Sequence, residues 1–127
     1  MAYLNYFLQF KAFADKNPSN SPSLSNMNWV RDVQGVVVTN QSSQYLTIPA
    51  SGVVTVFTSA AKKFLYLETS ANVSATINGT APLTVSPLTI GTVVSPGSLM
   101  LTSTVASLVL TNPSSTVAIT IFVACAE

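Results

Sequence analysis

Short runs of alternating apolar and polar residues follow one another from residue 34 to the end of the chain. In residues 73–77, valine, alanine and isoleucine alternate with serine and threonine, and in residues 117–124 valine and isoleucine alternate with alanine, threonine and phenylalanine. A period of two residues is the pattern of a strand with one buried face. Comparable runs occupy residues 36–39, 45–48, 53–58, 63–68, 83–85, 88–94, 99–102 and 105–110. The pattern therefore predicts about eight to ten short strands, which is typical of a sandwich or barrel.

Turn-forming residues separate these runs. Proline, glycine and asparagine cluster at 49–52, 78–79, 95–97 and 112–114, where proline fixes φ and glycine or asparagine tolerates a positive φ. Asn78-Gly79 suits the type I′ turn of a β-hairpin. No amphipathic helical pattern lies between the runs, which argues against parallel βαβ units. We expect an all-β protein whose residues 34–127 form an antiparallel β-sandwich or jelly-roll-like domain.

Residues 1–33 differ from the rest of the chain and predict an extended N-terminal arm. They hold six of the eleven aromatic residues and five of the nine charged ones. The polar, proline-punctuated stretch 17–23 predicts a flexible link between an aromatic tip and a second anchoring point at residues 27–32. The apolar residues at 4, 6, 8 and 10 alternate as in a strand, whereas those at 3, 7, 10 and 14 also fit a helix. We favour an extended tip.

The arm also holds the residues predicted to bind a partner. Aromatic, methionine and arginine side chains are enriched in the cores of protein interfaces, and residues 27–31 combine all three types. The alternative is that the aromatic tip folds back into the core of the domain itself. We favour contact with another subunit, made by Tyr3, Tyr6, Phe7, Trp29 and Arg31.

The low charge of the chain narrows the choice of partners. Only 7% of the residues are charged, and the formal net charge is +1. No basic patch suits nucleic acid or an anionic membrane, so neither is expected as a partner. Weak self-repulsion at a net charge near zero promotes association, which predicts a homo-oligomer or a component of a larger assembly. The N-terminal residues lack the pattern of a signal peptide, so synthesis in the cytosol is expected.

The residue types present argue against catalysis. Histidine is absent, and the four acidic residues, Asp15, Asp32, Glu68 and Glu127, are spread along the chain. The pattern therefore contains no catalytic triad, zinc site or evident pair of catalytic carboxylates. The five glycines are scattered singly and form no phosphate-binding loop. We expect no enzyme activity, no metal and no cofactor.

The single cysteine and the lysine pair at 62–63 are expected to have structural rather than chemical roles. Cys125 is the only cysteine, so no disulfide forms within the chain, and its place in the alternation with Ile121 and Val123 predicts a buried thiol. Lys62 and Lys63 open a strand, and a solvated pair of charges there is typical of a protected sheet edge. Contact with phosphate or with an acidic partner is the alternative for the lysine pair.

Within residues 36–126, strand-like and turn-forming segments follow one another at Phe64–Ser70, Val73–Gly79, Ser95–Leu101, Ser107–Ser114 and the closing apolar strand. In this pattern the chain resembles small virion proteins of tailed bacteriophages, in which a β-sandwich or jelly-roll-like module decorates or cements the capsid. The resemblance implies a non-enzymatic structural protein of the virion, made in the host cytoplasm and often trimeric. It also implies a partner, the major capsid protein, whose neighbouring subunits are tied together by burial of shared interfaces.

Two other functions stay open. The resemblance also covers tail, baseplate or head–tail connector components of a virion. A glycan-binding adhesion module is the second alternative, because sugar sites present exposed aromatic rings. The aromatic residues of the β domain argue against it, since most alternate with apolar neighbours as core residues do: Tyr45, Phe57, Phe64, Tyr66 and Phe122.

Overall fold

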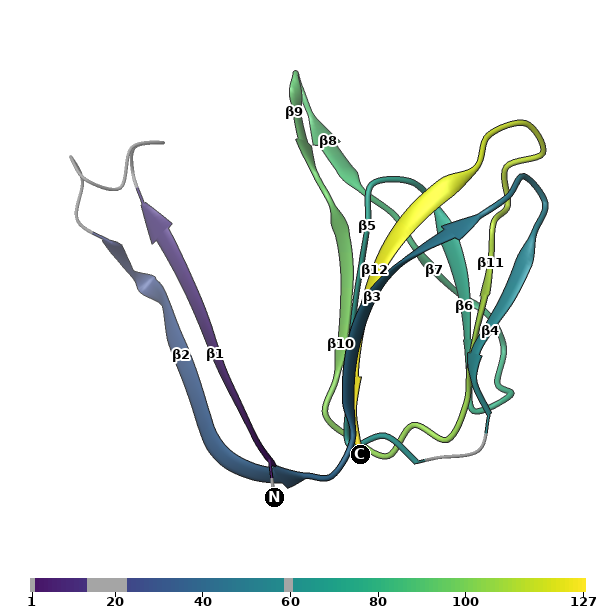
Figure 1. The fold of residues 1–127 in the computed structure, drawn as a ribbon. Coiled ribbons are helices and arrows are strands. Elements are labelled where there is room, and N and C mark those ends of the chain that lie inside the picture. Colours follow the sequence, from purple (N-terminus) through teal and green to yellow (C-terminus); the bar gives the residue numbers. More distant parts are fainter. Residues whose placement is uncertain (1, 14–22, 59–60) are drawn as a thin grey trace. The chain divides into compact units, whose positions relative to one another are not determined.

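The structure, a computed structural model, describes residues 2–13, 23–58 and 61–127 (Figure 1). These residues form strands joined by turns and contain no helix, which confirms the predicted all-β class. The part of the chain that is described thus includes no helix that could cross a membrane. The chain divides into two compact units, residues 1–38 and residues 39–127.

The first unit is a long antiparallel β-hairpin. β1 (Ala2–Phe13) pairs with β2 (Ser23–Val38) along its whole length. The extended form predicted for the aromatic tip is confirmed, and the helical alternative is excluded for residues 2–13. The segment predicted as a second anchoring point lies in β2 and pairs with the tip instead of standing apart from it. Of the predicted link at 17–23, only Ser23 is among the described residues, and the boundary predicted after residue 33 falls inside β2.

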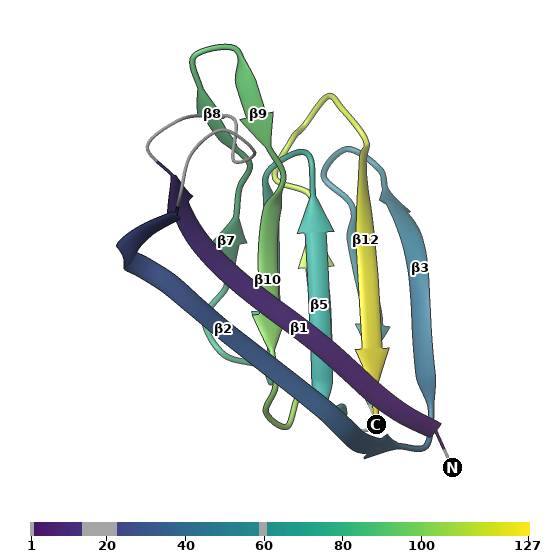
Figure 2. The same ribbon diagram turned by 90° about the vertical axis from the view of Figure 1, so that its left-hand side faces the viewer.

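The second unit contains two four-stranded antiparallel sheets. The first sheet has the order β10-β5-β12-β3 and comprises β3 (Gln41–Ile48), β5 (Phe64–Thr69), β10 (Gly97–Leu101) and β12 (Ile119–Ala126). The second sheet has the order β4-β11-β6-β7 and comprises β4 (Val53–Phe57), β6 (Val73–Ile77), β7 (Leu83–Val85) and β11 (Leu108–Thr111). Figure 2 shows the strands of the first sheet side by side.

The pairing of these eight strands is that of a jelly roll. Counted along the chain, the first strand pairs with the last (β3 with β12), the second with the seventh (β4 with β11), the third with the sixth (β5 with β10) and the fourth with the fifth (β6 with β7). A long hairpin rolled into two sheets produces this order, with two Greek keys. The prediction of a jelly-roll-like sandwich is therefore confirmed. β8 (Leu88–Ile90) and β9 (Val93–Ser95) form a separate hairpin inserted between β7 and β10.

The core lies between the two sheets and follows the predicted alternation. In β5 the side chains of Leu65 and Leu67 are fully buried, and in β11 those of Leu108 and Leu110 face them across the sandwich. Each fully buried leucine contributes about 2 kcal/mol to folding by leaving water. The predicted burial of Cys125 is confirmed, and its Sγ lies 3.2 Å from the Ser42 hydroxyl.

Two asparagines fix the loops at the ends of the sandwich. Asn78 and Gly79 have φ values of 52° and 68°, which confirms the predicted type I′ turn. The Asn78 side chain also accepts the backbone N–H of Ala106 at 2.6 Å, so the turn is tied to the segment before β11. Asn112 is 1% exposed, and its amide lies within hydrogen-bond distance of three backbone carbonyls, those of Ile48, Pro49 and Val117.

Candidate functional site

The residues predicted to bind a partner all belong to the β1–β2 hairpin. Tyr3 and Phe7 lie in β1, and each is 60% exposed. Tyr6 lies in the same strand, and Trp29 and Arg31 lie in β2. The side chains of Tyr6, Trp29 and Arg31 are outside the described part of the structure. The partner-binding role of these five residues stays a prediction.

A row of side chains crosses the outer face of the first sheet. Phe122 of β12 is the direct cross-strand partner of Tyr45 in β3 and of Glu68 in β5, and Glu68 is in turn opposite Ser98 in β10. Their neighbours Leu46, Leu67 and Ile121 point the other way and belong to the core or pack against it. Side chains that are directly opposite on one face contact each other. The row therefore joins two aromatic rings and a carboxylate across the sheet.

The structure corrects the assignment of Tyr45, Tyr66 and Phe122 to the core, whereas Phe57 packs against it. Tyr45 is 76% exposed, and Tyr66 and Phe122 are only half-buried. In β5 large apolar residues lie on both faces, so alternation alone does not show which face of this strand is buried. The sequence did contain one indication of the solvated face. Glu68 shares a face with Tyr66, and a carboxylate within a strand marks the solvated side.

A hydrogen bond links Tyr66 to the row. The Tyr66 hydroxyl donates to Glu68 Oε2 at 2.6 Å. This bond, with partial burial and the negative charge of Glu68, raises the pKa of Tyr66 to about 12. The phenol therefore stays protonated at physiological pH and continues to donate. It holds the carboxylate beside the Phe122 ring, whose centroid lies 6.2 Å from that of Tyr66.

A shallow hollow of about 270 Å³ opens beside this row. Its walls carry the rings of Tyr45 and Phe122, the carboxylate of Glu68, and three small polar or apolar groups from Ser70, Pro96 and Thr120. Pockets that combine aromatic surface with a few placed polar groups are typical of small-molecule sites. We name the hollow and the row together the aromatic ledge.

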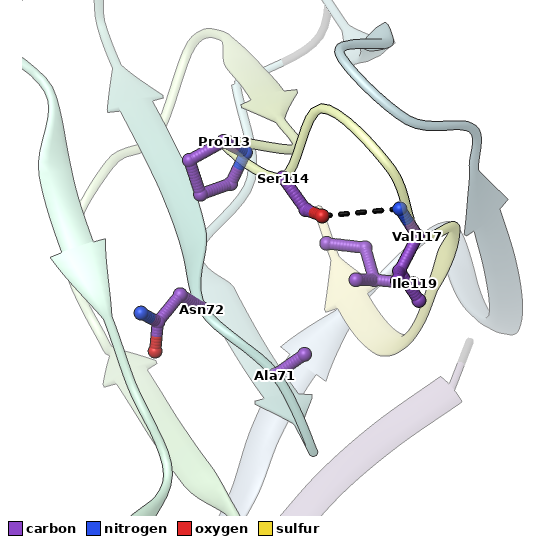
Figure 3. Close-up of a pocket in the computed structure, with 6 residues that line it drawn as sticks. All are labelled: Ala71, Asn72, Pro113, Ser114, Val117 and Ile119. Atoms are coloured by element: carbon purple, nitrogen blue, oxygen red, sulfur yellow. Dashed lines mark hydrogen bonds between the residues drawn. The ribbon is translucent and has the colours of Figure 1, made fainter.

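A second hollow, of about 350 Å³, lies at one end of the sandwich (Figure 3). It is lined by residues of the β5–β6 and β11–β12 connections and by the first residue of β12: Ala71, Asn72, Pro113, Ser114, Val117 and Ile119. Ser114 Oγ accepts the backbone N–H of Val117 at 3.1 Å, so this hydroxyl is engaged in the loop itself. None of these six residues is ionisable.

The β8–β9 hairpin exposes aliphatic side chains on both strands. Leu88 and Ile90 of β8 are 59% and 69% exposed, and Val93 and Val94 of β9 are 66% and 61% exposed. No charged residue lies between Ser70 and Ala126, so the edges of this hairpin lack the charges that usually protect open strands. The sequence pattern predicts one strand over 88–94. The structure instead reverses the chain at Gly91, whose φ of 61° suits the first central position of a two-residue turn.

The base of this hairpin is held by a close backbone approach. A Cβ atom added at Gly97 would lie 2.5 Å from the carbonyl carbon and oxygen of Ser86. Only glycine accepts such a contact without displacement of the backbone. Gly97 is itself buried, although every residue of β8 and β9 is exposed. The backbone is therefore closely packed at the root of the hairpin, while the apolar side chains of β8 and β9 face solvent.

The structure corrects the interpretation of the lysine pair. Lys62 is only 13% exposed, and its Nζ lies 2.7 Å from Glu127 Oε1 and 5.6 Å from the centroid of the Phe57 ring. Lys63 is exposed, but β5, which follows it, is an inner strand of the first sheet. The two lysines therefore do not form a solvated pair of charges that protects an edge strand. Hydrogen bonds from Lys62 and from Asn40 lower the pKa of Glu127.

The described residues contain no cluster of histidine, cysteine or acidic side chains that could hold a metal ion. In residues 39–127 the only carboxylate side chains are those of Glu68 and Glu127. Glu127 is bound to Lys62 and Asn40, and Glu68 is bound to Tyr66. Hydrolysis of glycosides by the usual route uses two carboxylates on opposite sides of one bond. The aromatic ledge contains one such carboxylate, that of Glu68.

Comparisons with protein-family models, with curated proteins and with solved structures found no match to this chain.

Proposed function

We propose that this protein is a non-enzymatic structural protein of a bacteriophage particle, which binds the capsid surface and joins neighbouring capsid subunits. The observation that carries the proposal is the β8–β9 hairpin. Its root at Gly97 is closely packed against the backbone of Ser86, and the hairpin carries no charge and exposes four aliphatic side chains to solvent. Exposed apolar surface of this kind marks a site of protein association.

The jelly-roll order of the strands supports the same proposal. Jelly rolls are frequent in viral capsid proteins and in lectins, so the fold is compatible with a virion component without being specific for one. The strands and turns of residues 36–126 resemble small virion proteins, as described above. The resemblance and the exposed hairpin are independent of each other, because the first rests on sequence and the second on the exposure of side chains.

The two hairpins have separate roles in this proposal. The β8–β9 hairpin makes the contact between copies of the chain in a homo-oligomer, for which we favour a trimer. An uncharged strand pair suits a copy of itself, because the low net charge of the chain causes little repulsion. The β1–β2 hairpin, with Tyr3 and Phe7 exposed, contacts the major capsid protein. Burial of both interfaces then ties subunits of the shell together.

Quantitative mass spectrometry of purified particles of the encoding phage tests the proposal. We expect the chain in a fixed proportion to the major capsid protein. A few copies per particle would assign it instead to a tail, baseplate or head–tail connector. Its absence from particles that contain all other structural proteins would contradict a structural role in the virion.

A further inference from the structure

The outer face of the first sheet carries a binding surface that the structural role does not use. We propose that the aromatic ledge, formed by Tyr45, Phe122, Glu68 and the hollow beside them, binds the pyranose ring of an uncharged carbohydrate. The inference goes beyond the proposed function. It involves none of the residues of the β8–β9 or β1–β2 hairpins, so either proposal can fail without the other.

The rings of Tyr45, Phe122 and Tyr66 lie next to one another and are tilted relative to each other. The centroids of Tyr45 and Phe122 are 5.2 Å apart with an interplanar angle of 53°, and those of Tyr66 and Phe122 are 6.2 Å apart at 60°. The face of an aromatic ring carries partial negative charge and attracts the weakly positive C–H groups on one side of a pyranose. A sugar ring that stacks on the exposed Tyr45 ring, with the tilted Phe122 ring at its edge, buries its apolar side and leaves its hydroxyls at the rim.

The spacing of the rings argues against a cationic ligand. Cages for quaternary ammonium groups surround the cation with the faces of several separate rings. The rings of Tyr45 and Phe122 in the aromatic ledge, and that of Tyr66 beside it, are within direct contact distance of their neighbours, so no space for a cation remains between them. An exposed ring with a second ring at its edge fits the flat side of a sugar better than the spherical surface of an ammonium group.

Polar groups lie where the hydroxyls of such a sugar need partners. Glu68 uses Oε2 for the bond from Tyr66, and within the described residues Oε1 has no hydrogen-bond donor. A carboxylate accepts hydroxyl hydrogen bonds about twice as strongly as a neutral acceptor does. The exposed hydroxyls of Ser70 and Thr120 line the same hollow. A negatively charged sugar is disfavoured, because its own carboxylate would lie near Glu68.

Saturation-transfer NMR on the full chain tests the site, since the method detects weak binding to an open surface. The probes are glucose, galactose and N-acetylglucosamine, with N-acetylneuraminic acid and choline chloride as charged comparisons. We expect at least one neutral sugar to receive saturation at its ring C–H protons. Tyr45→Ala should weaken its binding by about tenfold or more, because a stacked ring is lost, whereas Tyr45→Phe should bind nearly as well as the original chain.

Two further variants make the result specific to the ledge. Glu68→Gln keeps the shape of the side chain and removes its charge, so we expect the neutral sugar to bind several-fold more weakly. Val53→Ser removes an exposed apolar side chain from the second sheet and should leave binding unchanged. The proposal is overturned if no neutral sugar binds, if choline alone binds, or if Tyr45→Ala binds as well as the original chain. Tyr45 is 76% exposed, so its removal is not expected to unfold the domain.

Discussion

At the scale of single residues, buried polar groups define the loops of the jelly roll. Asn112 is the clearest case, because its amide contacts the carbonyls of Ile48, Pro49 and Val117 and its Oδ1 accepts the N–H of Ser114 at 2.9 Å. One side chain thus connects the end of β11 to the β3–β4 turn and to the start of β12. An unmade hydrogen bond of a buried group costs about 1–3 kcal/mol.

Removal of the Asn112 side chain should therefore reduce the stability of the fold strongly. We expect Asn112→Ala to lower the free energy of unfolding by about 3 kcal/mol or more, since several backbone groups lose their partner together. Urea unfolding followed by circular dichroism measures the change. Asn72→Ala is the matched control, because Asn72 is exposed and should change stability little. Equal effects of the two variants would contradict the role given to Asn112.

The ion pair between Lys62 and Glu127 predicts a dependence of stability on pH. The pKa of Glu127 in the folded protein lies below its ordinary value of 4.5, chiefly because Lys62 and Asn40 donate to its carboxylate. The resulting stabilisation is complete above pH 4.5 and is lost as the pH falls through the lower folded pKa. Lys62→Met should thus destabilise the protein at about pH 7 and have a smaller effect at about pH 3.

Urea unfolding at both pH values checks this expectation. Lys63→Met is the control, because Lys63 is the neighbouring lysine and is exposed. An effect of Lys62→Met that is the same at both pH values would show that lost packing against Phe57, rather than the ion pair, causes the destabilisation.

At the scale of strands and turns, the features that could be predicted from the sequence are those that neighbouring residues determine. The alternation in β6 and β12 identified the buried face, and Asn78-Gly79 identified a type I′ turn, because these features depend on neighbouring residues alone. The pairing of β1 with β2 was not predicted, since the register between distant segments depends on contacts that periodicity does not report. The run 88–94 was read as one strand because Gly91 is a weak signal inside an apolar segment.

The same limit explains why the aromatic ledge was missed. Tyr45, Phe122 and Glu68 are far apart in the sequence and meet only through the register of β3, β12 and β5. The alternation identified the buried face of β12, but it reports nothing about which residues of other strands lie beside Phe122 on the outer face. A cross-strand row requires knowledge of which strands are neighbours, and in a jelly roll these are mostly distant along the chain.

At the scale of the whole molecule, composition and fold both lead us to expect that the protein assembles with other subunits. A chain with a charged fraction of 7% and a net charge of +1 relies on polar uncharged residues for solubility, and its jelly roll presents an unprotected apolar hairpin. Many of its strand pairs join distant segments, and folds of this kind fold slowly. In the virion role that we propose, a slow unfolding rate would add persistence outside the cell. The low charge and the exposed hairpin support the proposed role in assembly.

Sedimentation velocity of the full chain tests this central claim most directly, with a variant that carries both Ile90→Ser and Val94→Ser. We predict that the original chain sediments as a stable oligomer, a trimer in our proposal, and that the variant dissociates. The control carries Val53→Ser and Val117→Ser, which remove two side chains that are each 61% exposed, as Val94 is, and it should stay associated. An original chain that is monomeric at every concentration, or a hairpin variant that associates as strongly as the control, would contradict the account.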